Sequence, residues 1–250
     1  MKLDHVAIAA PDHRPVLQAL TGELGALVLS GGTPPRAGFR AMQVRLGRGL
    51  DGMTVEILEP YQPENNDFLA RFVEATGGGV HHITFKTDDI VAEQARLQSI
   101  GIEPVGVDFA DPGWKEMFIH PKDAHGTVIQ IAQSGWEPPP MDEWLAALPE
   151  ALMIFDQSES GPWWDPSCVA TAGVAATLER VVIATPDLDA GSDFYVGVLG
   201  GEADDRSVRW DGGEIALEES TDRPRVERLE IRGHATKEIT GVRFVETRPR

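Results

Sequence analysis

Residues 3–12 (LDHVAIAAPD) carry the phrase that decides the fold, and the chain repeats it at 80–89 (VHHITFKTDD) and 178–187 (LERVVIATPD). Each copy is an apolar run that leads to an aspartate, a pattern typical of a strand followed by a turn and a helix start. A repeated unit of this size rarely buries its apolar face alone, so we expect the copies to pack together. The third position of the phrase is His5, His82 and Arg180 in chain order.

The segments that follow the first two copies predict the same order of elements, βαβββ. In the first unit, which runs to residue 62, we expect a helix over 14–24 and strands over 27–29, 39–46 and 53–58. A short helix over 68–75 should link it to the second unit. There we expect a helix over 89–100 and strands over 104–107, 115–120 and 127–133. Gly25 and Gly101 stand where the two long helices should end.

The third copy opens a less complete unit. It predicts a helix over 189–199 and strands over 207–210 and 214–218, and two further strands, 226–231 and 241–245, look like a truncated fourth unit. We therefore expect paired modules at 1–136, a connector rich in proline and tryptophan at 137–174, and a degenerate third module with a partial fourth at 175–250. The expected fold class is α+β.

The composition argues against several classes of function. A chain of 250 residues with a formal net charge of −18 lacks the basic face that nucleic acid binding needs, and anionic membrane surfaces repel it. No apolar run reaches the length of a membrane span, and the first residues predict a strand instead of a signal peptide. The single cysteine, Cys168, suits a reducing compartment as an unreactive thiol, so we expect a cytoplasmic protein.

Four polar side chains interrupt apolar strands at equivalent places in the first two units. His5 and His82 lie in the first strand of each unit, and Glu56 and Gln130 lie in the last. Any one of them taken alone is typical of a strand face exposed to solvent. Because the positions are equivalent, we expect the four to converge, and a metal ion would offset the cost of burying them. His81, beside His82, points the other way, toward a supporting role or the surface.

These phrases, together with 118–123 (FIHPKD) and 126–131 (GTVIQI), resemble the vicinal oxygen chelate superfamily of glyoxalases, bleomycin resistance proteins and extradiol dioxygenases. In the first half of the chain the resemblance is greatest to methylmalonyl-CoA epimerase. It implies tandem βαβββ modules that form a cupped half-barrel around one divalent metal, and a small-molecule substrate that chelates the metal through two neighbouring oxygens. The epimerase ligands are His, Gln, His and Glu, and the matching residues here are His5, Glu56, His82 and Gln130.

The exchange of glutamate and glutamine changes the expected chemistry. Gln130 cannot carry the proton that the resemblance assigns to a glutamate there, and 40–43, where it puts the second base, contains no carboxylate. Glu56 is then the remaining proton carrier. We therefore expect an isomerase or lyase that works through a metal-stabilised enolate, with Mn, Fe, Co, Ni or Zn as the ion.

Two other functions remain open. Two histidines and one carboxylate also suit an Fe(II) dioxygenase of the extradiol type, although in that group the resemblance puts the carboxylate at the place of Gln130. The other is a non-catalytic ligand-binding or resistance protein of the same fold. The resemblance puts substrate contacts near Trp114 and Lys115, and Lys122 lies in a turn beside the last strand. The oligomeric state stays open, a homodimer included.

The third unit carries no equivalent ligands. Arg180 and Arg228 stand at the histidine positions, and Ala216 stands at the glutamate position. We expect this part of the chain to serve as a scaffold or an interface. Its arginines would also suit an anionic ligand, because a guanidinium group pairs well with carboxylates and phosphates.

Overall fold

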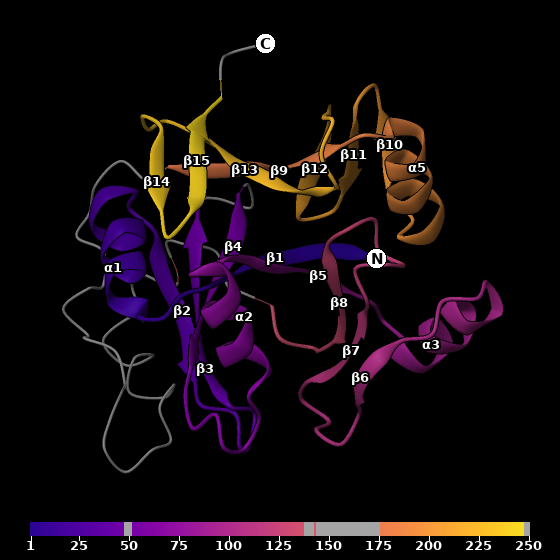
Figure 1. Cartoon of the computed structure of the whole chain (residues 1–250), viewed down its shortest axis with the longest axis horizontal. Helices are drawn as coiled ribbons and strands as arrows, with labels where there is room; N and C mark the ends of the chain where they lie inside the picture. The colour runs from indigo at the N-terminus through magenta and orange to yellow at the C-terminus, as the bar shows by residue number, and fades with distance from the viewer. Residues whose placement is uncertain (48–51, 138–142, 144–175, 248–250) are drawn as a thin grey trace. The chain divides into compact units, whose positions relative to one another are not determined.

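The computed structural model describes residues 1–47, 52–137, 143 and 176–247 (Figure 1). Of the expected connector, 137–174, only Glu137 and Glu143 lie among these residues, so Cys168 falls outside them. The described chain is α+β, with two mixed sheets and short helices, and it confirms the expected fold class.

The first two units form an eight-stranded sheet. The first comprises β1 (Lys2–Ala9), α1 (His13–Gln18), β2 (Leu27–Gly32), β3 (Phe39–Leu46) and β4 (Met53–Pro60). After α2 (Phe68–Thr76), the second comprises β5 (Gly79–Lys86), α3 (Ile90–Ser99), β6 (Val105–Asp108), β7 (Lys115–Ile119) and β8 (Val128–Gln133). The strand order is β2-β3-β4-β1-β5-β8-β7-β6, so the two strands that carry the histidines, β1 and β5, are neighbours.

The third unit and the strands after it form a seven-stranded sheet. They comprise β9 (Thr177–Thr185), α5 (Leu188–Ser192), β10 (Glu202–Asp204), β11 (Ser207–Trp210), β12 (Gly213–Glu219), β13 (Arg225–Arg232), β14 (Lys237–Ile239) and β15 (Val242–Glu246). The order β10-β11-β12-β9-β13-β15-β14 matches the first sheet strand for strand, except that no described strand takes the place of β6. The sequence does not predict β10 and β14, because strands of three residues are too short to show a period.

The aspartate that ends each copy of the repeated phrase caps the helix that follows it. The side chain of Asp89 accepts hydrogen bonds from the backbone N–H groups of Val91 and Ala92, and Asp12 and Asp187 cap their helices in the same way. Each carboxylate thus satisfies backbone donors that have no partner inside the helix. None of the helices in the described part of the chain is long and apolar enough to cross a membrane.

The helices of the first and third units continue as π-helical turns. Leu24 N bonds Ala19 O at 3.1 Å after α1, and Leu199 N bonds Phe194 O at 3.2 Å after α5, each pair being five residues apart. The sequence predicts one plain helix here, because a single π turn leaves the apolar spacing nearly unchanged. Gly25 follows the first turn with a φ of +70°, the left-handed conformation that glycine adopts at least cost.

The chain divides into two compact units, and each has its own core. One unit comprises Met1–Val6, His81–Glu137 and Glu179–Glu230; the described part of the other lies within 7–80, 176–178 and 231–247. In the first unit, the rings of Phe85 and Trp210 lie 5.1 Å apart and Tyr195 is fully buried. In the second unit, α2 contributes Leu69 to an apolar cluster whose other buried members are Ala7, Ala9 and Leu58.

Both faces of β1 are buried. His5, Ala7 and Ala9 share one face, Val6 and Ile8 share the other, and none of the five side chains has exposed surface. A polar side chain on this strand is therefore cut off from solvent, and its hydrogen-bond partners have to lie inside the protein.

Candidate metal centre

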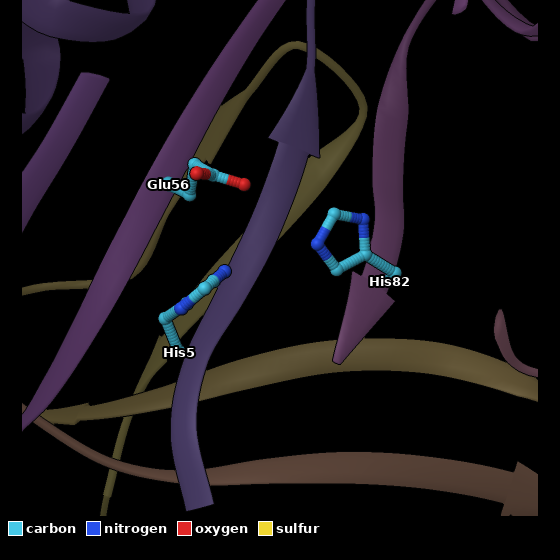
Figure 2. Close-up of side chains that lie close together, drawn as sticks. All are labelled: His5, Glu56 and His82. Carbon is cyan, nitrogen blue, oxygen red and sulfur yellow. The ribbon is translucent and has the colours of Figure 1, made fainter. Parts of the chain in front are cut away.

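His5 and His82 lie on the neighbouring strands β1 and β5, with their ring centroids 5.8 Å apart. Glu56 on β4 completes a group in which one ligand atom of each residue lies within 4.8 Å of the others (Figure 2). His5 has no exposed surface, His82 is 4% exposed and Glu56 is partly buried. The solvent-facing alternative is therefore wrong for both histidines.

Each nitrogen of the His5 imidazole lies close to a polar oxygen. Its Nδ1 lies 2.7 Å from a carboxylate oxygen of Asp4, and its Nε2 lies 2.9 Å from the hydroxyl oxygen of Thr84. Burial alone would raise the pKa of Asp4, but the hydrogen bond from His5 and the charge of Lys86, 3.0 Å away, hold it at about 2. The ionised carboxylate only accepts, so Nδ1 donates to it and Nε2 is the nitrogen that can bind a metal.

Burial lowers the pKa of His82 well below its usual value, and His81 and His5 beside it add to the effect. The imidazole of His82 is therefore neutral at neutral pH, which is the form that binds metal ions. Its Nδ1 lies 2.8 Å from Nδ1 of His81, so a metal would be bound through Nε2. His81 itself is only 6% exposed; it supports its neighbour, and the surface alternative for it is wrong.

Gln130 on β8 lies beside both histidines. β5 and β8 pair in parallel with Thr84 opposite Gln130, and the Thr84 hydroxyl donates to Gln130 Oε1 at 2.6 Å. The same hydroxyl oxygen lies 2.9 Å from His5 Nε2, and Gln130 is close enough to His82 to affect the pKa of its imidazole. Because Gln130 is only 5% exposed, the solvent-facing alternative is wrong for this residue too.

Glu56 is the carboxylate of the group, and its cross-strand partner on β3 is Gln43. The Arg40 side chain, on the segment where the resemblance puts a second base, lies 2.5 Å from Glu59 instead. Amide and guanidinium groups do not titrate near neutral pH, so neither Gln43 nor Arg40 can act as a base. Within the group, Glu56 is the residue suited to take up and release a proton.

The set of donor groups fits a first-row divalent ion. Two imidazoles, one carboxylate and one amide oxygen are ligand types that Mn, Fe, Co, Ni and Zn accept. A divalent ion that meets a single carboxylate keeps a net positive charge, which suits a ligand that brings negative charge.

The three residues expected to contact substrate differ in their surroundings. Trp114 is partly buried, and its ring stacks on that of His5 with centroids 6.4 Å apart. Lys115 begins β7 and is partly buried. The Lys122 side chain is 73% exposed and lies 3.7 Å from Asp123. Trp114 is therefore at the site, whereas Lys122 lies on the surface.

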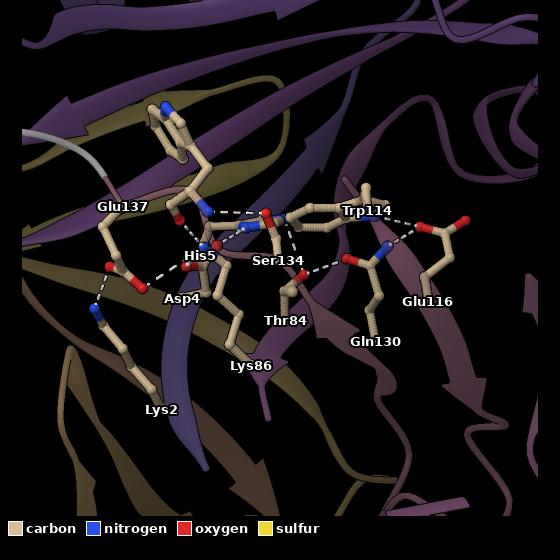
Figure 3. Close-up of polar contacts among 11 residues, drawn as sticks. Lys2, Asp4, His5, Thr84, Lys86, Trp114, Glu116, Gln130, Ser134 and Glu137 are labelled. Carbon is tan, nitrogen blue, oxygen red and sulfur yellow. Dashed lines mark hydrogen bonds and ion pairs between the residues drawn. The ribbon is translucent and has the colours of Figure 1, made fainter. Parts of the chain in front are cut away.

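Three charged residues join the site although the sequence does not single them out: Asp4, Lys86 and Glu116 (Figure 3). Lys86 carries a signal, since the alternation of β5 puts it on the same strand face as His82. Asp4 and Glu116 carry none, because an acidic residue at the start of a strand is typical of a solvated surface.

A second group of acidic and histidine side chains lies near the ends of β1 and β4. The ligand atoms of Asp12, His13 and Glu59 come within 4.8 Å of one another, and the three residues line a cavity of about 490 Å³ with Arg14 and Arg40. Glu59 accepts hydrogen bonds from His13 N and Nδ1 and from the Arg40 guanidinium. Burial would raise the pKa of Glu59, but these bonds lower it. A cation here would compete with the guanidinium, so this group is structural.

Comparison with known proteins establishes the family. Residues 4–118 match the model of the Glyoxalase/Bleomycin resistance protein/Dioxygenase superfamily. The ethylmalonyl-CoA/methylmalonyl-CoA epimerase of Cereibacter sphaeroides is 30% identical over 136 residues, which are 53% of this chain and 97% of that protein. The chain therefore belongs to the glyoxalase/bleomycin resistance/dioxygenase superfamily, and the expected resemblance is confirmed.

Several other relatives and solved structures are epimerases. Human mitochondrial methylmalonyl-CoA epimerase is 30% identical over 136 residues, which are 53% of this chain and 74% of that protein. A variant of Streptomyces coelicolor methylmalonyl-CoA epimerase in complex with 2-nitronate-propionyl-CoA aligns with 56% of this chain and 99% of its own, with 25% identity and a TM-score of 0.49. The Mycobacterium tuberculosis epimerase aligns with 54% of this chain and 89% of its own, with 23% identity and a TM-score of 0.48.

Proposed function

We propose that this protein is a divalent-metal-dependent isomerase or lyase that moves a proton at the carbon next to a carbonyl group. The observation that carries the proposal is the group of His5, Glu56 and His82, whose ligand atoms lie within 4.8 Å of one another, with Gln130 beside the histidines. The relatives at 30% identity are epimerases of acyl-CoA compounds, which supports an acyl-CoA as the substrate.

A divalent ion bound there would supply positive charge to offset the negative charge that develops on the substrate oxygen as the proton leaves. His5 and His82 hold the ion through nitrogens whose orientation their neighbours set. Gln130 adds a neutral oxygen and Glu56 carries the proton, because it is the titratable acid of the group.

The surrounding side chains bind and enclose the substrate in this proposal. Trp114 stacks on His5 and excludes water from one side of the reacting group. Lys115, partly buried at the start of β7, pairs with an anionic part of the substrate, and Lys122 on the surface contacts a part that extends outward.

Two measurements on one preparation test the proposal. Elemental analysis of protein purified without added metal should find about one equivalent of a transition metal per chain. Deuterium exchange at the α-carbon of methylmalonyl-CoA, followed by NMR, should then fall about 100-fold or more in Glu56→Gln, which removes the proton carrier. The control is Glu64→Gln, since Glu64 is exposed. Exchange that survives in Glu56→Gln, or a protein whose His5→Ala variant keeps its metal, would contradict the proposal.

The same group supports a second candidate. Two histidines and one carboxylate are also the ligands of non-haem Fe(II) enzymes that activate oxygen. Oxygen uptake with a catechol and Fe(II), lost in His82→Ala, would favour this dioxygenase, whereas α-proton exchange without oxygen uptake favours the isomerase or lyase. A ligand that binds without either reaction would identify a non-catalytic binding protein.

A further inference from the structure

We propose that Asp4 and Glu116 are positioning residues that decide which atom of His5 and which atom of Gln130 faces the metal. The proposal rests on the metal site proposed above and adds to it. Both ligands have two different ends: an imidazole has two nitrogens, of which the neutral ring protonates one, and an amide has an oxygen and an NH2 group. Only the unprotonated nitrogen and the oxygen can bind a cation, so each ligand has to be held the right way round.

Glu116 orients Gln130. The Nε2 of Gln130 donates to Glu116 Oε2 at 2.7 Å, while its Oε1 accepts from the Thr84 hydroxyl at 2.6 Å. The same Oε2 accepts from the indole N–H of Trp114, which can only donate, so this oxygen is an acceptor and only the NH2 end of the amide can face it. The oxygen of Gln130 is thereby turned toward Thr84. The hydroxyl oxygen of Thr84 also lies 2.9 Å from Nε2 of His5, the nitrogen that we propose as a ligand.

The pairing of β7 and β8 explains how Glu116 reaches this amide. Phe118 lies opposite Gln130, and Glu116 lies opposite Ala132. Glu116 is therefore a diagonal neighbour of Gln130 on the same sheet face, a separation that two long side chains can span. The contact follows from the register of one hairpin and lies within one compact unit.

Asp4 orients His5 by the same rule. Its Oδ2 lies 2.7 Å from His5 Nδ1, and its Oδ1 lies 3.0 Å from Lys86 Nζ, which can only donate. A carboxylate held between these two nitrogens accepts from both, so the proton of the neutral ring lies on Nδ1. The neutral ring then has its lone pair on Nε2. A carboxylate behind a histidine ligand fixes the tautomer and makes the other nitrogen a better donor to a metal.

Each carboxylate is itself held by a group that can only donate. Lys86 Nζ lies 3.0 Å from Asp4 Oδ1 and donates to Trp136 O at 2.7 Å, and the indole N–H of Trp114 donates to Glu116 Oε2 at 2.8 Å. Lys86 Nζ also lies over the Trp114 ring, 5.9 Å from its centroid. Figure 3 shows these contacts. Lys86 holds Asp4, which in turn holds the ligand His5, and Trp114 holds Glu116, which in turn holds the ligand Gln130.

Cobalt binding to the full chain tests the proposal without any assay of catalysis. We expect Glu116→Gln and Asp4→Asn each to weaken Co²⁺ binding about 10- to 100-fold by calorimetry, with a changed visible absorption of the Co(II) protein. Both substitutions keep the shape of the side chain but introduce an amide that can donate as well as accept. The matched control is Glu202→Gln on exposed β10, which should bind Co²⁺ like the unmodified chain.

The decisive comparison uses a ligand that needs no orienting. In Gln130→Glu both ends of the ligand are equivalent oxygens, and Glu116 becomes a like charge beside it. Glu116→Gln should therefore leave Co²⁺ binding unchanged or strengthen it in that background, although it weakens binding in the unmodified chain. A Glu116 that merely supports the hairpin would cost the same in both backgrounds, and equal losses would overturn the proposal.

The outcomes separate this proposal from the one it rests on. An unmodified chain that binds no Co²⁺ would overturn both. A chain that binds about one equivalent, with Glu116→Gln and Asp4→Asn binding equally tightly and with the same spectrum, would keep the metal site and overturn only the positioning roles. Weakened binding with the reversal in the Gln130→Glu background supports both.

Discussion

The two sheets of this protein share one strand order but hold different chemistry at equivalent positions. The matching strand orders put β9, β12 and β13 at the places of β1, β4 and β5, so Arg180 stands at the place of His5, Ala216 at that of Glu56 and Arg228 at that of His82. In the first sheet these places hold groups that can bind a metal ion. In the second they hold two guanidinium groups and a methyl group.

The second sheet surrounds its arginines with the chain's own carboxylates. Arg180 lies 3.2 Å from Glu230 and 3.6 Å from Glu214, and Arg228 lies 2.5 Å from Glu218 and 2.9 Å from Glu230. In the second sheet the positive charge thus belongs to arginine side chains. At the equivalent place in the first sheet we propose a metal ion that can exchange. In each sheet, charged side chains cluster at the same strand positions. The residue types at these positions decide whether a ligand can bind there.

Replacing a histidine of the first sheet with the arginine found at its place in the second sheet should have the largest effect on metal binding. We expect His82→Arg to weaken metal binding by more than about 100-fold, because a guanidinium stays protonated and cannot act as a ligand. Equilibrium dialysis with metal analysis measures this. Since His82 is buried, His82→Gln serves as a smaller change, and retention of one equivalent of metal in both variants would break the comparison.

Removing the cation of the second sheet should affect stability and leave metal binding unchanged. Arg180→Met leaves the carboxylates of Glu214 and Glu230 without this partner, and we expect the free energy of unfolding to fall by about 1–3 kcal/mol. Urea unfolding of the apo protein measures the change, with Arg206→Met as the control because Arg206 is exposed. A loss of metal in Arg180→Met would show that the second sheet is not independent of the site.

The first sheet also contains an arginine–glutamate ion pair, Arg40 with Glu59, like those of the second sheet. The pH dependence of stability shows what this pair contributes. The pKa of Glu59 is lowered in the folded protein, so its stabilisation is present above its usual pKa of 4.5 and is lost as the pH falls through the lower, folded value. We expect Glu59→Gln to lower the free energy of unfolding by about 1–2 kcal/mol at pH 7 and by less near pH 3. Denaturant unfolding across this range checks both. An equal loss at each pH would contradict the assignment.

The smallest expected effect comes from the reverse exchange. Arg180→His combined with Ala216→Gln restores an imidazole and an amide to the second sheet, but no carboxylate ligand. We therefore expect this variant to bind no more metal than the unmodified chain. Metal analysis after dialysis measures this directly. A second equivalent of bound metal would show that strand geometry alone is enough to build the site.

Much of the fold could be predicted from the repeated phrase, because its signals are local. Apolar alternation marks the strands, and the aspartate at the end of each copy caps the next helix. The π-helical turns and the three-residue strands β10 and β14 were beyond this reasoning, since they leave no distinct period. The domain limits around the connector and the cytoplasmic location stay predictions.

The candidate site divides in the same way. Equivalent places in two copies were enough to predict that His5, His82, Glu56 and Gln130 belong together. The surface alternative for His81 is wrong, because this side chain is only 6% exposed although it lies on the strand face opposite to that of His82. The groups behind the ligands could not be predicted from one chain.

The sequence by itself determined the order of the strands and helices and picked out the residues that we propose as ligands, since each signal depends on residues close together in the chain or on the repeat. Only the tertiary structure decided which atoms face the proposed metal. Asp4 keeps the proton of His5 on Nδ1 by accepting a hydrogen bond from it, and Glu116 turns the Gln130 amide because β7 pairs with β8 in one register. The orientation of Gln130 depends on Glu116 from the neighbouring strand, and the Asp4 carboxylate that orients His5 is itself held by Lys86 from β5, so no local pattern of residues specifies either.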